Sequence, residues 1–172
     1  MNKKCTLLFS LIILATIGVG FYFLRPTYKR EQEQTGKTTP QNLVYTNTEY
    51  NFTFPVPESW KDYSIITSTW EGYTINAEGQ VPAEHGPLIS IRHPLYTTEK
   101  PRQDIPIMVF TLAQWDLVSK EKIVLGAAPI GPSKLGENVR YVFALPARYN
   151  YAFPEGFEEV QTILDNHPLR AY

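Results

Sequence analysis

An uninterrupted apolar run near the start of the chain constrains the fold more than any other feature. Residues 5–24, CTLLFSLIILATIGVGFYFL, contain no charged side chain. At about 1.5 Å per residue, a helix of this length spans about 30 Å, the thickness of a bilayer's hydrocarbon core. The aromatic rings at the end of the run, directly before Arg25, are typical of the membrane interface. The sequence therefore predicts a single-pass transmembrane anchor over residues 5–24.

Two other interpretations of this run stay open. A cleaved signal peptide would have a shorter apolar core and then a small-residue cleavage site, which residues 18–20 (GVG) match loosely. The run continues through residues 21–24 (FYFL), which favours an uncleaved anchor. A buried helix of a soluble protein is the third interpretation. A lipoprotein signal does not fit, because its cysteine would follow the run and Cys5 stands at its start.

The anchor divides the chain into four predicted parts. A short head, residues 1–4, precedes it; a polar linker, residues 25–42, follows it; and residues 43–172 form one domain. The linker has almost no large apolar side chains with which to offset the entropy of ordering. Basic residues flank both ends of the anchor, but long C-terminal domains translocate largely regardless of flanking charge. We therefore expect a cytoplasmic head and an extracytoplasmic domain tethered to the membrane.

The charges are distributed unevenly along the chain. The first 30 residues carry five basic and no acidic side chains, whereas the remainder carries 11 basic and 17 acidic ones, a net charge of −6. An acidic domain lacks the basic surface that nucleic acids require, so we expect no nucleic-acid partner. The lone cysteine lies in the anchor, and the three histidines lack the spacing of metal ligands. We expect neither a metal ion nor a cofactor.

Hydrophobic periodicity in the domain favours strands over helices. Residues 50–54 alternate aromatic and polar side chains, which indicates a half-buried strand, and Pro55 and Pro57 are expected to end it. Residues 76–87, rich in Gly, Pro and Glu, are expected to form a loop. Because no strand–helix alternation repeats, we expect an α+β domain with a mostly antiparallel sheet and helices packed on it. Further strands are predicted over residues 63–73, 88–92, 106–112 and 139–145, and helices over residues 113–122 and 154–166.

Several core positions follow from these patterns. Trp60 comes after the two prolines and is expected to be buried against the sheet. Residues 106–112 are apolar almost throughout, which is typical of a central strand covered on both faces. The remaining core candidates are Ile65, Ile66 and Trp70 of the second strand and Val139, Tyr141, Phe143 and Leu145 of the last one.

The opening of the domain, residues 50–60 (YNFTFPVPESW), resembles that of PsbP-like domains, whose first strands read roughly Y-x-F-x-F-x-x-P-x-x-W. The resemblance implies an antiparallel sheet with helices on both faces, in a domain outside the cytoplasm. It covers about 11 of the 172 residues, and the matching residue types are structural. Nothing else matches the photosynthetic members, so their photosystem role is not carried over. In style the chain is closer to small membrane-anchored bacterial proteins with this opening.

Most catalytic motifs are absent from the domain. Residues 126–133 have the glycine spacing of a phosphate-binding loop, but Pro132 stands where the lysine must be. There is no Gly-x-Ser-x-Gly elbow and no cysteine nucleophile. One weak catalytic candidate remains: His93 at a strand end could act as a general base with Asp104 or Glu99. The alternative function is therefore a small envelope hydrolase, although a His-Pro pair at a strand end is more often a turn element.

The segment after the last strand is the best candidate for a binding surface. Arg148, Tyr149 and Tyr151 follow Pro146, where a loop is expected, and loops often carry function. Aromatic rings beside a guanidinium suit stacking on a sugar or anchoring a protein partner. We therefore expect a non-catalytic, membrane-tethered domain that binds a protein or an envelope polymer. The rings could instead cap the core edge, and a structural or assembly role also stays open.

The anchor makes a prediction about processing. Because the apolar run continues past Gly20, the mature protein is expected to keep residues 1–24 and to fractionate with membranes. Intact-mass measurement of the purified chain checks this directly. A mature chain that begins near Phe21 would show that the run is a cleaved signal peptide.

Overall fold

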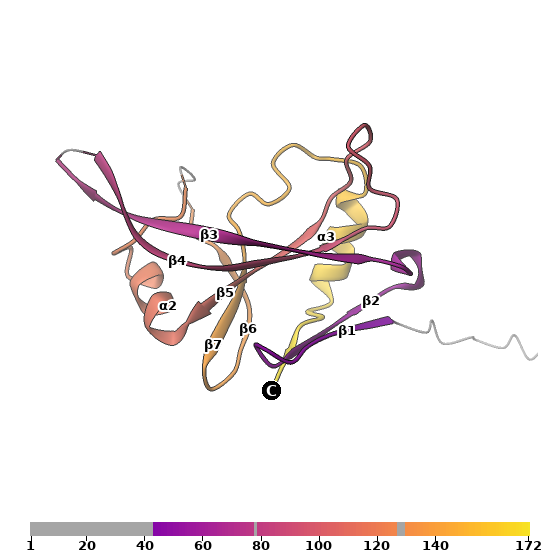
Figure 1. The fold of residues 1–172 in the computed structure, drawn as a ribbon, viewed down its shortest axis with the longest axis horizontal. Coiled ribbons are helices and arrows are strands. Elements are labelled where there is room, and N and C mark those ends of the chain that lie inside the picture. Colours follow the sequence, from indigo (N-terminus) through magenta and orange to yellow (C-terminus); the bar gives the residue numbers. More distant parts are fainter. Residues whose placement is uncertain (1–42, 78, 127–129) are drawn as a thin grey trace, which may run out of the picture. The chain divides into compact units, whose positions relative to one another are not determined.

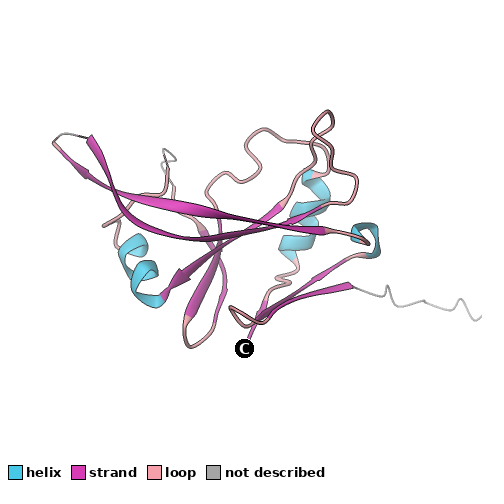
Figure 2. Cartoon of the chain, in the orientation of Figure 1, coloured by secondary structure: helices cyan, strands magenta, loops and turns pink. Residues whose placement is uncertain are grey.

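The computed structural model describes residues 43–77, 79–126 and 130–172, so the predicted head, anchor and linker lie outside the described residues. Two antiparallel sheets and two α-helices make up this part of the chain, and strands predominate (Figures 1 and 2). The prediction of an α+β fold with mainly antiparallel strands is therefore confirmed. Within these ranges, no helix is long and apolar enough to cross a bilayer.

The smaller sheet has three strands in the order β1-β2-β8. Their bounds are β1 Leu43–Asn47, β2 Phe52–Val56 and β8 Arg170–Ala171. Phe52, Phe54 and Val56 point into the core and are fully buried or nearly so, as their alternation predicts. Pro55 does not end β2, as the sequence suggested, but lies within it. It is tolerated there because β8 pairs only with Phe52 and Thr53, which leaves the end of β2 open on that side.

The larger sheet has five strands in the order β3-β4-β5-β7-β6. Their bounds are β3 Ser64–Asn76, β4 Gly79–Arg92, β5 Ile105–Thr111, β6 Ser133–Glu137 and β7 Tyr141–Leu145. Strand β5 lies at the centre and is buried on both faces. Ile105, Ile107 and Val109 enter one core cluster, whereas Met108 and Phe110 enter another. The prediction of a central strand covered on both faces is confirmed.

The two helices cover opposite faces of the larger sheet. Helix α3 (Phe157–Asp165) contributes Val160 and Leu164 to the cluster on the side of the smaller sheet. Helix α2 (Leu112–Ser119) packs Trp115 on the cluster of the other face. Thr111 caps α2, because its side chain accepts a hydrogen bond from the Gln114 backbone while the Gln114 side chain accepts one from Thr111. Both helices lie where the sequence predicts them, and each is shorter than predicted.

The expected loop over residues 76–87 is wrong, because Gly79–Arg92 forms β4 and pairs along its whole length with β3. The prolines and glycines of this segment are typical of loops, which is why a loop was expected. From Gly79 to Pro87, β4 has a partner on one side only, since its pairing with β5 begins at Leu88. A proline whose missing N–H faces an open side costs no ladder hydrogen bond. Ala83 is the extra residue of a β-bulge, which accommodates the irregular sequence within the β3–β4 pairing.

Two of the core candidates are exposed. Ile66 is 38% exposed, because it lies on the edge strand β3 where nothing in the described ranges covers its face. Val139 is 88% exposed, because Asn138 organises a tight turn and the alternation of β7 begins only at Tyr141. Trp60, at 1% exposed, is buried as predicted, in the short 3-10 helix Glu58–Trp60.

Trp60 makes a prediction about stability. Trp60→Ala is expected to lower the free energy of unfolding by about 3–5 kcal/mol, the cost of truncating a large aromatic core side chain. Trp60→Phe is the matched control, because the indole N–H has no hydrogen-bond partner among the described residues and its loss breaks no bond. Phe is therefore expected to cost clearly less than Ala in urea melts. A loss below about 1 kcal/mol for Trp60→Ala would contradict the buried position.

Candidate functional site

Two loops meet at one end of the larger sheet, and we call residues 93–104 and 146–156 the loop pair. The first joins β4 to β5, and the second joins β7 to α3. Arg102 and Glu155 form an isolated parallel bridge between them, and the Gln103 backbone N–H donates to the Glu155 carbonyl at 2.9 Å. The two loops that carry the sequence candidates, His93 in one and Arg148 in the other, are thus joined to each other.

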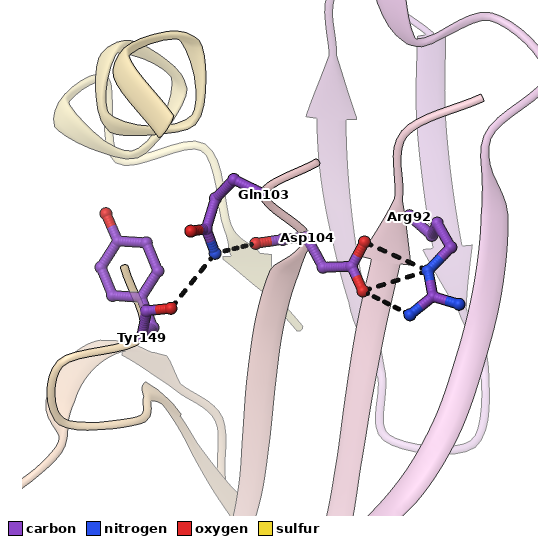
Figure 3. A network of polar contacts seen from close by, with 4 residues as sticks. All are labelled: Arg92, Gln103, Asp104 and Tyr149. Atoms are coloured by element: carbon purple, nitrogen blue, oxygen red, sulfur yellow. Dashed lines mark hydrogen bonds and ion pairs between the residues drawn. The ribbon is translucent and has the colours of Figure 1, made fainter. Parts of the chain in front are cut away.

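Gln103 holds the loop pair together from inside. Its side chain is only 6% exposed, and its amide nitrogen donates to the carbonyl oxygens of Asp104 at 2.8 Å and Tyr149 at 3.3 Å (Figure 3). Its amide oxygen is buried without a hydrogen-bond partner in the described chain. Because a buried amide needs partners, a substitution here would disturb both loops at once.

Asp104 is engaged by Arg92 in a two-point ion pair (Figure 3). The shortest contact joins Arg92 Nη2 to Asp104 Oδ2 at 2.8 Å, and the guanidinium also stacks over the Tyr96 ring at 3.9 Å from its centre. The hydrogen bonds to Asp104 raise the pKa of Arg92. This carboxylate is therefore committed to fixing the start of β5 against the end of β4.

His93 is a buried residue with a defined orientation. It is 4% exposed, and its ring meets Trp60 edge-on at 5.0 Å between ring centres. Its Nδ1 accepts a hydrogen bond from the Leu95 backbone N–H at 3.1 Å, which leaves the proton of the neutral ring on Nε2. No hydrogen bond or ion pair of the described chain joins His93 to Asp104 or Glu99. The structure does not assemble the catalytic pair suggested by the sequence.

The surroundings of His93 favour its neutral form. Burial lowers the pKa of His93, and the positive charge of Arg102 lowers it further. Glu159 and Glu155 act in the opposite direction with smaller effect. Arg102 forms an ion pair with Glu155, and this pairing weakens the electrostatic effect of either charge on the imidazole. A buried, neutral histidine whose Nδ1 already accepts a bond is a packing element of this end of the sheet.

Gly156 allows the second loop to close over Arg102. Its φ of 83° lies in the left-handed region, and a Cβ there would stand 3.1 Å from Arg102 Nη2. Any other residue would both strain the backbone and press on the guanidinium. Neither Arg102, Gln103 nor Gly156 was identified from the sequence, because their roles depend on contacts about 50 residues apart and no local motif marks them.

The predicted binding residues divide between core and surface. Arg148 and Tyr151 are exposed, with the guanidinium 5.9 Å from the centre of the Tyr151 ring. Tyr149 instead packs against the first core cluster, and its hydroxyl donates to Gln161 of α3 at 3.0 Å. Burial raises the pKa of Tyr149, with a smaller contribution from Asp165. Phe153, which the sequence analysis did not select, is 65% exposed beside Tyr151 in the same turn.

The remaining polar chemistry of the described residues is sparse. They contain no group of three or more His, Cys, Asp or Glu side chains that could hold a metal ion. Three surface hollows lie away from the loop pair. They are lined by residues of β2 and α3, of β3 and α2, and of the β1–β2 turn with β3 and β4. His93 lines none of these three hollows.

Comparisons with protein-family models, with curated proteins and with solved structures found no match for this chain. The PsbP-like resemblance therefore continues to rest on residues 50–60 alone.

His93 makes a prediction about pH. Its pKa is lowered in the fold from about 6.5, so below that pH the unfolded chain binds the proton more strongly. The free energy of unfolding is therefore expected to fall as the pH drops from about 7 to about 5. In His93→Gln this slope should flatten, whereas His85→Gln, a change at an exposed histidine, should keep it. Equal slopes for His93→Gln and the natural chain in urea melts would refute the prediction.

Proposed function

We propose that this chain is a membrane-tethered extracytoplasmic binding domain of the PsbP-like type. In this proposal, residues 5–24 anchor the chain and residues 25–42 hold the domain off the membrane. The loop pair then contacts a protein partner or an envelope polymer. The α+β architecture, with helices on opposite faces of the larger sheet, is what the resemblance of residues 50–60 implies, and it supports this part of the proposal.

One observation carries the binding role: exposed aromatic rings stand on a loop whose base is buried. Tyr151 and Phe153 are 73% and 65% exposed, and Arg148 lies beside them. Tyr and Arg are enriched among the residues that dominate binding energies, because they offer large contact area with a polar end. The exposed area of these rings contributes no apolar burial to the fold.

The base of this loop is fixed by contacts that sequence alone did not indicate. Tyr149 packs on the core, its carbonyl accepts from Gln103, and Glu155 pairs with Arg102. Arg148 and Phe153 have φ values of 54° and 45°, a left-handed conformation that is costly for residues other than glycine. A loop already held in one conformation loses little entropy when a partner binds.

The alternative of a small envelope hydrolase lacks an observation in its favour. Asp104 is committed to Arg92, and Nδ1 of His93 is committed to the backbone of Leu95. A general base needs a reachable proton acceptor and a site for substrate. The imidazole is 4% exposed, so a substrate would have to displace the ring of Trp60 or the loop over it.

The binding role is tested with a double change that spares the loop's base. Tyr151→Ala with Arg148→Asn should weaken capture of the native partner at least tenfold, in pull-downs from envelope extracts and on purified envelope polymer. Asn is chosen because it tolerates the left-handed conformation at residue 148. Stability should change by no more than about 0.5 kcal/mol. Tyr149 is left unchanged because its ring is partly buried against the first core cluster.

The matched control removes the same residue types elsewhere. Arg140 is exposed and Tyr172 is 60% exposed, and neither lies in the loop pair. Arg140→Asn with Tyr172→Ala should leave capture unchanged. Equal capture by the natural chain and the folded loop-pair variant would exclude these rings as the binding surface.

A further inference from the structure

A tight turn joins β1 to β2, and Asn51 is its last residue. The φ of Asn51 is 59°, in the left-handed region that asparagine tolerates better than most residues. Its backbone carbonyl accepts hydrogen bonds from the Tyr172 N–H at 3.0 Å and from the Asn138 side chain at 3.2 Å. The side-chain amide of Asn51, by contrast, makes no hydrogen bond within the described residues. The backbone of this residue is therefore fixed, whereas its amide is free.

The free amide of Asn51 is also in contact with solvent. In the described part of the chain, the buried polar side-chain atoms without a hydrogen-bond partner belong to Trp60, Arg102 and Gln103. The amide of Asn51 has no partner and is not one of these buried groups, so its nitrogen and oxygen reach the surface. The hydroxyl of Thr53, two residues later in β2, meets the same two conditions. An incoming molecule can therefore approach both groups.

Asn51, Phe52 and Thr53 together form an acceptor motif for asparagine-linked glycosylation, Asn-x-Ser/Thr without an intervening proline. Of the eight asparagines in the sequence, only Asn51 has a serine or threonine two positions later. Glu49 stands two positions before it, where the bacterial form of the motif carries an acidic residue. Such a motif is expected on the surface of an exported protein, and the β1–β2 turn provides that context.

We propose that Asn51 carries an N-linked glycan in the mature protein. The inference rests on the extracytoplasmic placement in the proposed function, because the transfer takes place on that side of the membrane. The donor is an oligosaccharide linked to a lipid pyrophosphate, and a membrane-bound transferase catalyses the reaction. The bond between C1 of the first sugar and the phosphate oxygen breaks, and the oxygen keeps the electron pair. C1 bonds to Nδ2 of Asn51, which gives up one proton to water.

The order in which the fold closes favours this transfer. Thr53 pairs with Arg170 of β8, and the Asn51 carbonyl accepts from the Tyr172 N–H. A chain that crosses the membrane from its N-terminal side delivers residues 51–53 long before residues 170–172. The acceptor segment therefore reaches the transferase before β8 can pair with it.

The completed fold accommodates sugars at this turn. An open hollow of about 490 Å³ begins at Glu49 and Tyr50, the two residues directly before Asn51. Its other wall includes residues 67–69 of β3, which all have hydroxyl side chains suited to hydrogen bonding with sugars. Within the described ranges, β3 pairs with β4 alone along these residues. A bulky, hydrated glycan in this hollow hinders the addition of a foreign strand at that edge.

Mass spectrometry of the full chain, isolated from its own envelope, tests the modification. The proteolytic peptide that contains Asn51 should exceed the mass of its sequence by that of an oligosaccharide. Treatment with a glycoamidase should remove the excess and convert Asn51 to aspartate, which fragmentation of the peptide locates. A peptide found only at its unmodified mass would overturn the proposal.

Four variants test the motif against its surroundings. Asn51→Asp should lose the glycan, because aspartate tolerates the left-handed conformation but has no amide nitrogen. Thr53→Val keeps the shape of a β-branched strand residue without the hydroxyl and should also lose it, whereas Thr53→Ser should keep it. Asn47→Asp in the same hairpin is the matched control and should keep the glycan, because Glu49 follows Asn47 at the second position. A glycan that persists in Thr53→Val would contradict the assignment.

Protease added to intact cells, stripped of any outer layer, separates failure of this proposal from failure of the proposed function. An unmodified domain that the protease digests lies outside the cytoplasm, so the glycan proposal falls and the extracytoplasmic placement stands. An unmodified domain that is protected lies inside, and both fall together.

Discussion

Burial of β5 on both faces is the constraint on which the rest of the described structure depends. Ile107 and Val109 need one apolar layer, and Met108 and Phe110 need another. The first layer comes from the smaller sheet and α3, and the second comes from α2 and Trp70. A strand that is apolar on both faces cannot lie at an edge or face water, so this short segment requires elements on each side of the sheet.

The sequence predicted the elements whose burial is local and periodic. Alternation in residues 50–54 and the apolar run over residues 106–112 were interpreted correctly, because one or both faces of these strands meet the core. The first half of β4, within the expected loop over residues 76–87, was missed because it is largely exposed and its prolines lie on an open side. Composition alone cannot separate such an extended hairpin from a loop. What distinguishes them is the pairing partner, which lies in another part of the chain.

Prediction of the candidate site from the sequence was limited in a similar way. The sequence offered one candidate in each loop separately: His93 with Asp104 or Glu99 in the first, and the segment from Arg148 onward in the second. Their contact depends on Gln103 reaching the carbonyl of Tyr149, 46 residues away. A single glutamine carries no signal of that kind in a sequence. The partial burial of Tyr149 was not foreseen for a related reason, because alternation does not reveal that its hydroxyl reaches Gln161 of α3.

The polar groups at this end of the sheet mainly hold segments of the chain in position. Arg92, Gln103 and Arg102 each bind a partner that joins one segment to another, and His93 fills space against Trp60. In a partly buried ion pair, the cost of desolvation offsets much of the electrostatic attraction. The main effect of such a pair is therefore to fix geometry. That geometry keeps Tyr151 and Phe153 exposed, while Tyr149 packs against the first core cluster and Phe157 contacts the Phe153 ring edge-on. The rings are therefore exposed because the loop's base is already satisfied, and a partner that covers them need not reorganise the fold.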